Sequence, residues 1–117
     1  MFIKIRDENY KVIVNTKSSI NEVLSKVTER FRLKAIPHPH PFNVSYISST
    51  ALEVEQLCLV LVDFNLYKDK IWCDVVTLDV GQIILGRPWL FDKNVTIYSQ
   101  SNMCQFSIKV RRFSYYP

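Results

Sequence analysis

The chain has 117 residues, of which 48% are hydrophobic and 13% are aromatic. This length suits a single domain, residues 1–117, and the composition favours a packed core over extended disorder. The net charge of +4 at pH 7 is milder than the dense basic stripe that nucleic-acid binding requires, so we do not expect a nucleic-acid partner.

The cysteines and apolar segments bear on the cellular compartment. Cys58, Cys73 and Cys104 are widely spaced and odd in number, which indicates neither a disulfide framework nor a zinc site, and their apolar contexts predict buried thiols. Residues 1–7 alternate rather than forming the apolar block of a signal peptide, and no apolar run approaches the length of a membrane span. We expect an intracellular, cytoplasmic protein without membrane contact.

The amino-terminal third predicts a hairpin followed by a helix. Residues 2–6 and 10–14 are rich in β-formers and flank the polar residues 7–9. Apolar residues then recur at helical spacing from Ile20 to Phe31, which predicts the main helix of the chain, ending near Leu33. Ser19 and Glu22 form a capping-box pattern at its start.

The rest of the chain predicts strands. The alternating prolines of residues 37–41 predict an extended, polyproline-like segment. The expected strands and turns are residues 42–47 and 52–55 around a polar tip at 48–50, strands 57–66 and 70–78 around a turn at 67–69, a buried strand at 83–85, a helical turn at 87–92, and a closing hairpin of 95–98 and 104–110. The predicted fold is one all-β domain with a single main helix.

Two segments carry a more specific pattern. Residues 11–19 read Lys-Val-Ile-Val-Asn-Thr-Lys-Ser-Ser, and residues 82–89 read Gln-Ile-Ile-Leu-Gly-Arg-Pro-Trp. With the order of elements, they resemble the signature strands of a retropepsin-like aspartic protease monomer, a closed barrel-like β-fold with a flap hairpin. The wording of residues 38–44, 67–76 and 84–92 resembles the protease segment of Pol polyproteins from plant gypsy-class LTR retrotransposons.

The resemblance covers residues 2–106, whereas residues 107–117 form a divergent tail. In this family two copies pair about a two-fold axis and each contributes one aspartate. The resemblance therefore implies a homodimer and a peptide or polyprotein substrate, which would lie as an extra strand beneath the flap. It implies no cofactor and no metal, and it adds a retroelement particle as an alternative to the cytoplasmic location.

The family's functional positions match this chain only in part. Thr16 matches the hydroxyl that braces the two catalytic turns, and Ile84, Leu85 and Gly86 match the strand that packs behind them. The flap corresponds to residues 42–55, and its expected substrate-binding tip is Tyr46, Ile47, Ser48, Ser49, Thr50 and Ala51.

Two departures fall in the signature itself. Asn15 stands where the catalytic aspartate belongs, and Lys17 stands where the signature has glycine. A carboxamide cannot accept a proton at any usable pH, and a homodimer would lose both catalytic bases together. We expect the backbone geometry and the like charges of two Lys17 side chains to disfavour a normal dimer seam.

Four other patterns suggest rival sites. Asp79-Val80-Gly81 reads Asp-x-Gly but lacks the bracing hydroxyl, so a turn is the better interpretation. His38 and His40 could hold a metal but have no evident third ligand. The remaining patterns are Trp72 and Trp89, which could stack on ligands but suit core or dimer-edge packing, and Ser18 and Ser19, which are explained by helix capping rather than by a nucleophile.

Three functional hypotheses follow. The first is a degenerate aspartic endopeptidase that retains the fold and has lost proteolysis. The second is a non-enzymatic dimerisation or extended-peptide-binding module that uses the residual cleft. The third is activity restored by pairing with an intact copy that carries aspartate.

Overall fold

The computed structural model describes residues 2–45, 51–64, 67–77, 83–101, 103–108 and 111–115. Its first elements are the predicted hairpin of β1 (Phe2–Ile5) and β2 (Glu8–Val14), which pair antiparallel. Arg6 and Asp7 join them with positive φ angles of 49° and 67°, as a tight two-residue hairpin turn requires.

The predicted main helix is largely wrong. Its first turn is instead the strand β3 (Glu22–Leu24), and only α1 (Ser25–Arg30) is helical. β3 runs parallel to β6 on one side and antiparallel to β7 on the other, and all three of its residues are buried. The predicted capping box is also wrong, because the helix begins after Leu24 with no side-chain cap.

Long strands form the middle of the chain. They are β4 (Ala35–Ser45), β5 (Ala51–Asp63) and β6 (Lys68–Val76). β5 pairs antiparallel with both neighbours, and the two strands predicted at 52–55 and 57–66 are one continuous element. Residues 37–41 are extended as predicted, but they belong to β4 rather than to a free polyproline segment.

The short elements near the carboxyl end agree closely with prediction. β7 (Ile83–Leu85) lies between β2 and β3, and α2 (Arg87–Asp92) follows it with Pro88 in its first turn. β8 (Thr96–Tyr98) and β9 (Met103–Ile108) pair as the predicted closing hairpin.

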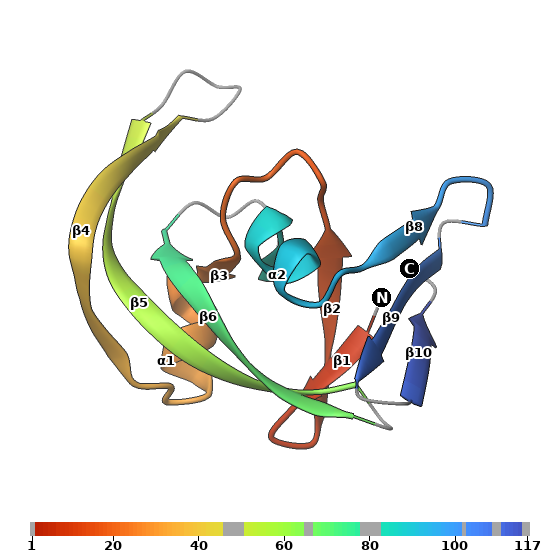
Figure 1. Cartoon of the computed structure of the whole chain (residues 1–117). Coiled ribbons are helices and arrows are strands. Elements are labelled where there is room, and N and C mark those ends of the chain that lie inside the picture. Colours follow the sequence, from red (N-terminus) through yellow and green to blue (C-terminus); the bar gives the residue numbers. More distant parts are fainter. Residues whose placement is uncertain are drawn as a thin grey trace.

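Six strands close into a barrel. They follow one another in the order β1-β2-β7-β3-β6-β5, and β5 returns to β1 at the pair Lys4↔Asp63. β4 lies outside this circuit, on the other edge of β5, and curves away from the barrel in Figure 1. The fold is all-β with two short helices among the described residues, as the sequence predicts.

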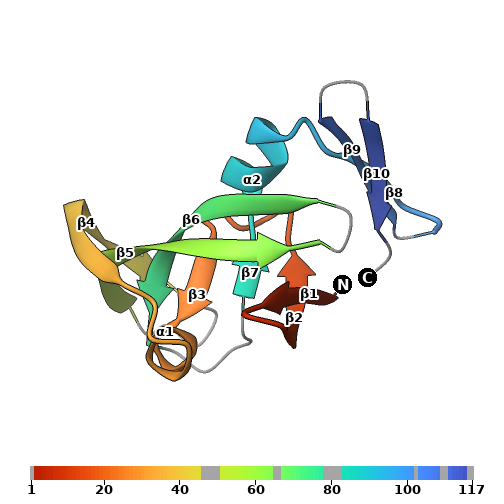
Figure 2. The same cartoon turned by 90° about the horizontal axis from the view of Figure 1, so that it is seen from below.

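The divergent tail is an integral strand. β10 (Arg111–Tyr115) pairs with β9, making a three-stranded sheet at the opposite end of the molecule from β4 (Figure 2). The Tyr115 hydroxyl donates a 2.8 Å hydrogen bond to the Phe64 carbonyl oxygen. The Tyr115 ring stacks 5.7 Å from Phe106, which packs 5.4 Å from Trp89. An aromatic cluster thus joins the small sheet to the barrel.

The buried core extends from the barrel strands to α2 and β9. Trp89 and Phe64 are the largest fully buried side chains, and the three cysteines are free and buried, as predicted. Within the described residues, no helix is long and apolar enough to cross a membrane.

Candidate active site

The turn that follows β2 carries the substituted signature. The Asn15 amide donates a 3.0 Å hydrogen bond to the Leu85 carbonyl of β7, which fixes the start of the turn against the barrel. The Asn15 side-chain oxygen accepts a 2.9 Å bond from the amide of Lys17, and its carbonyl accepts a 3.2 Å bond from the amide of Ser18. Asn15 thereby closes a tight Asx turn on itself.

Gly86 supports this turn from behind. A Cβ atom at Gly86 would overlap the carbonyl oxygen of Ile20 and would lie 2.8 Å from that of Ser18. Its φ of −100° is open to any residue, so close backbone approach, rather than conformational freedom, requires glycine here. The Arg87 amide adds a 2.9 Å bond to the Ser18 carbonyl. The strand 83–85 and the turn therefore form one rigid unit.

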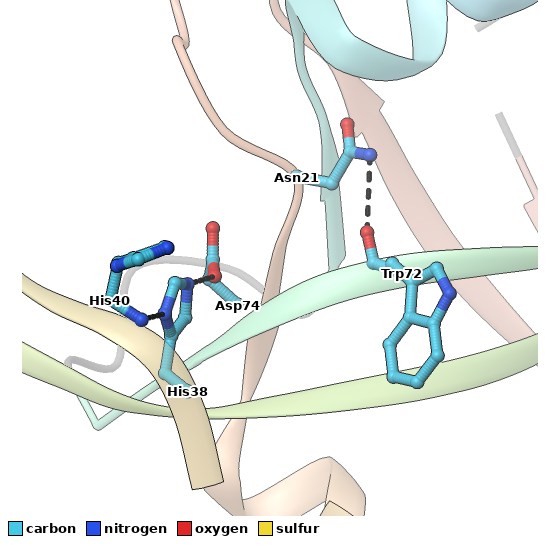
Figure 3. Close-up of polar contacts among 5 residues, drawn as sticks. All are labelled: Asn21, His38, His40, Trp72 and Asp74. Carbon is cyan, nitrogen blue, oxygen red and sulfur yellow. Dashed lines mark hydrogen bonds and ion pairs between the residues drawn. The ribbon is translucent and has the colours of Figure 1, made fainter. Parts of the chain in front are cut away.

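Asn21 ties the end of the turn to three other segments. Its side-chain oxygen accepts hydrogen bonds from the amides of Gly86, at 2.9 Å, and Trp89, at 3.4 Å. Its side-chain nitrogen donates 3.3 Å to the carbonyl of Trp72, as Figure 3 shows. Asn21 is only 7% exposed, so a buried carboxamide does the positioning. Sequence reasoning missed it, because an isolated asparagine after a turn carries no local signal of its long-range partners.

The side chains at the tip are open to solvent. Thr16 and Lys17 are exposed and Asn15 is half-buried. Lys17 is not among the non-glycine residues with positive φ, so the backbone of this turn accepts lysine without strain. The expected effect of Lys17 on a dimer seam stays a prediction. The serines also differ from expectation, because the Ser18 hydroxyl donates a 2.7 Å bond to the Ile20 carbonyl and caps the turn, not a helix.

The hairpin predicted as the flap lies only partly within the described residues. Its arms are β4 and β5, which pair from Phe42↔Val54 to Ser45↔Ala51. The predicted tip residues Tyr46, Ile47, Ser48, Ser49 and Thr50 lie outside the described residues, and Ala51 is described only as the first residue of β5. The rival triplet Asp79-Val80-Gly81 also lies outside them.

The two histidines do not act as a pair. His38 Nε2 lies 3.1 Å from Asp74 Oδ1 on β6, whereas the His40 side chain is exposed. Among the described residues, no three His, Cys, Asp or Glu side chains come together in a group able to hold a metal ion. Of the tryptophans, Trp89 is in the core as predicted, and Trp72 is 51% exposed on the outer face of β6 and is not core.

A buried acidic pair lies beside His38. Glu22 and Asp74 are partners in the parallel ladder of β3 and β6. Burial, and secondarily the Asp74 carboxylate, raises the pKa of Glu22. Burial also raises the pKa of Asp74, against the opposing effect of His38. No local pattern predicts this cluster, because its three members come from three strands that are far apart in the sequence.

A cavity of about 720 Å³ lies elsewhere. It is bounded by the β1–β2 turn, residues 33–34, β5 and β6, and none of Asn15, Thr16 and Lys17 lines it. Five cationic side chains and three aspartates surround it, so its charge is mixed. It is therefore separate from the turn that carries the substituted signature.

Comparison with known proteins identifies the fold. The sequence matches no protein-family model and no curated protein. The structure is similar to the crystal structure of the retroviral protease-like domain of Ddi1 from Leishmania major, with a TM-score of 0.62 and 12% sequence identity. The match covers 95% of this chain and 87% of that chain. At this identity the likeness shows a retroviral protease-like fold and nothing about activity.

Proposed function

We propose that this chain is a degenerate copy of the protease segment of a plant gypsy-class LTR retrotransposon Pol polyprotein, folded as a retropepsin-like domain and without proteolytic activity. The observation that carries the proposal is the position of Asn15. It follows β2 directly, is hydrogen-bonded to Leu85 of β7, and begins the tight turn that rests on Gly86. In a retropepsin-like fold this is the place of the catalytic aspartate.

The chemistry of aspartic proteolysis explains why asparagine silences the site. Two carboxylates close together share one proton, so that the ionised member takes a proton from water and the neutral one donates to the scissile carbonyl. The Asn15 carboxamide can donate and accept hydrogen bonds but cannot take up that proton. A symmetric dimer would present two such amides, and neither would be a base.

A peptide-binding role is the second candidate. Among the described strands, β4 is the terminal strand of its sheet and pairs only with β5, so its other edge offers backbone groups to an extended peptide. Strand addition of this kind needs no catalytic group, because main-chain hydrogen bonds provide affinity and side-chain pockets provide selectivity. A carboxamide at Asn15 in place of the catalytic carboxylate is compatible with this role.

The test separates the two activities in one preparation. The unaltered chain is incubated at mildly acidic pH with a mixed peptide pool, and cleavage products and retained peptides are both identified by mass spectrometry. We expect no cleavage. Retention of extended peptides would support the binding role, and cleavage sensitive to a pepsin-type inhibitor would refute the loss of activity.

A further inference from the structure

β4 leaves its ladder with β5 at one place. Pairing runs from Ala35↔Cys58 to Pro37↔Gln56 and resumes at Phe42↔Val54, with a register shift between. Residues 38–41 therefore face the single residue 55 of β5, which makes a large bulge in β4. Two of these four residues are prolines, which have no amide hydrogen to restore the ladder. The bulge must be held by something other than β5.

His38 holds it through three contacts, two of which Figure 3 shows. Its Nδ1 accepts a 2.9 Å hydrogen bond from the amide of His40, inside the bulge. Its Nε2 lies 3.1 Å from Asp74 Oδ1, and both side chains are largely buried, at 13% and 12% exposed. Its ring meets Phe42 edge-on at 5.3 Å, where pairing with β5 resumes. The His38 imidazole thus contacts the amide of His40 within the bulge, Phe42 where the ladder resumes, and Asp74 of the barrel strand β6.

These contacts fix the tautomer of the neutral ring. An Nδ1 atom that accepts an amide hydrogen carries no proton, so the neutral ring has its proton on Nε2, facing Asp74. Asp74 faces the ring from β6, and Glu22 stands behind Asp74 on β3, buried and adjacent in the ladder. The His40 ring, on β4 itself, is exposed.

We propose that His38 is a pH-responsive hinge residue of β4, the outer arm of the flap. When the ring takes a second proton from solvent on Nδ1, it keeps Asp74 through Nε2 but releases the amide of His40, and residues 38–41 loosen. This inference rests on the proposed function only in that the arm would cover a peptide bound to the domain.

The direction of the switch follows from the surrounding groups. Histidine is the side chain whose ordinary charge change falls between about pH 5 and pH 8, and the Asp74 carboxylate lies 3.1 Å from Nε2, the nitrogen that already carries the proton of the neutral ring. A protonated Nδ1 is a donor, and two N–H groups cannot bond to one another. The ring therefore stays anchored on the barrel while the backbone of the bulge is freed.

The test follows two NMR signals of the whole chain, the His38 ring and the His40 amide, from about pH 8 to about pH 5. The ring ¹⁵N shifts report the protonation of His38, and amide exchange, corrected for its intrinsic pH dependence, reports the bond at His40. We expect Nδ1 to be unprotonated at the upper limit. On protonation, the His40 amide should lose about fivefold to tenfold of its protection with the same midpoint.

Two variants isolate the cause. His38→Asn offers a side-chain oxygen to the same amide but cannot titrate, so the pH-dependent step should disappear. His40→Gln removes the exposed ring and keeps the amide at that position, so the step should persist. The proposal is overturned if His38→Asn retains the step, if His38 does not titrate in this range, or if it titrates while the His40 amide stays protected.

In the wild-type chain, the comparison of the His38 ring shifts with the His40 amide exchange tests the proposal even if the His38→Asn variant does not fold. No peptide is present in this experiment. A failure to bind peptide would therefore refute the binding role without affecting this result, and a missing step would leave the binding role intact.

Discussion

The amide of Asn15 donates a hydrogen bond to the carbonyl of Leu85 across 3.0 Å, so the first residue of the turn is held by the strand that precedes Gly86. The turn of residues 15–20 and the strand β7 therefore move as one unit. This support does not depend on the chemistry of the Asn15 side chain. A domain with asparagine at this position can consequently keep the architecture of the turn.

Gly86→Ala should be strongly destabilising. The added Cβ would overlap the Ile20 carbonyl oxygen and approach that of Ser18, and both are backbone atoms that cannot move aside. We expect a loss of about 3 kcal/mol in the free energy of unfolding, measured by chemical denaturation. Ser19→Ala, at an exposed position of the same turn, is the control and should change stability by less than about 0.5 kcal/mol. Equal stability of the two variants would contradict the close packing.

Asn21→Ala should also be costly, for a different reason. It removes the acceptor of the Gly86 and Trp89 amides and the donor to the Trp72 carbonyl. Leaving these buried groups unpaired should cost about 2–3 kcal/mol in thermal or chemical unfolding. Asn21→Asp keeps the acceptor oxygen but loses the donor, so it should fall between wild type and Asn21→Ala. A loss no larger for Ala than for Asp would contradict the role of the oxygen.

Glu22→Gln should raise stability at neutral pH. Burial and Asp74 raise the pKa of Glu22 above its ordinary value of 4.5. The folded state therefore binds the Glu22 proton more tightly than the unfolded state does. The contribution of this proton to the free energy of unfolding is fully present below the ordinary pKa and is lost as pH rises through the raised pKa. We expect Glu22→Gln to gain about 1 kcal/mol at pH 7 and little near pH 4. Unfolding curves at both pH values test this expectation, and Glu29→Gln, at an exposed position of α1, is the control. A gain that is equal at both pH values would contradict it.

Tyr115→Phe tests whether the divergent tail is docked. The Tyr115 hydroxyl donates 2.8 Å to the Phe64 carbonyl in a half-buried position. Its loss should lower the free energy of unfolding by about 1 kcal/mol. Tyr98→Phe is the matched control, because the Tyr98 hydroxyl donates to Gln105 at the exposed surface, at 3.2 Å, and should matter less. If both changes have no effect, β10 does not contribute to the fold.

The sequence predicted most elements because their signals are local. The hairpin of β1 and β2 and the turn of α2 follow from nearby residues alone. β3 was mistaken for helix because Val23 and Leu24 fit helical spacing, whereas their strand conformation depends on β6 and β7, far along the chain.

The same limit applies to the sites. The resemblance directed attention to Asn15 and Gly86, and the structure brings their segments together. It gave no indication of the contact between His38 and Asp74, because the contact joins β4 and β6, which are not neighbours in the sheet. Long-range polar contacts of this kind have no periodic signature.

The central claim is that one turn silences a sound protease scaffold. The direct measurement is a peptidase assay at mildly acidic pH that compares the unaltered chain with Asn15→Asp/Lys17→Gly, with Asn15→Ala/Lys17→Gly as the matched control. We predict cleavage by the first variant alone, abolished by a pepsin-type inhibitor, because only that variant restores the proton-accepting pair. Inhibitor-sensitive cleavage by the unaltered chain, or none by Asn15→Asp/Lys17→Gly when it is folded and dimeric, would contradict the claim.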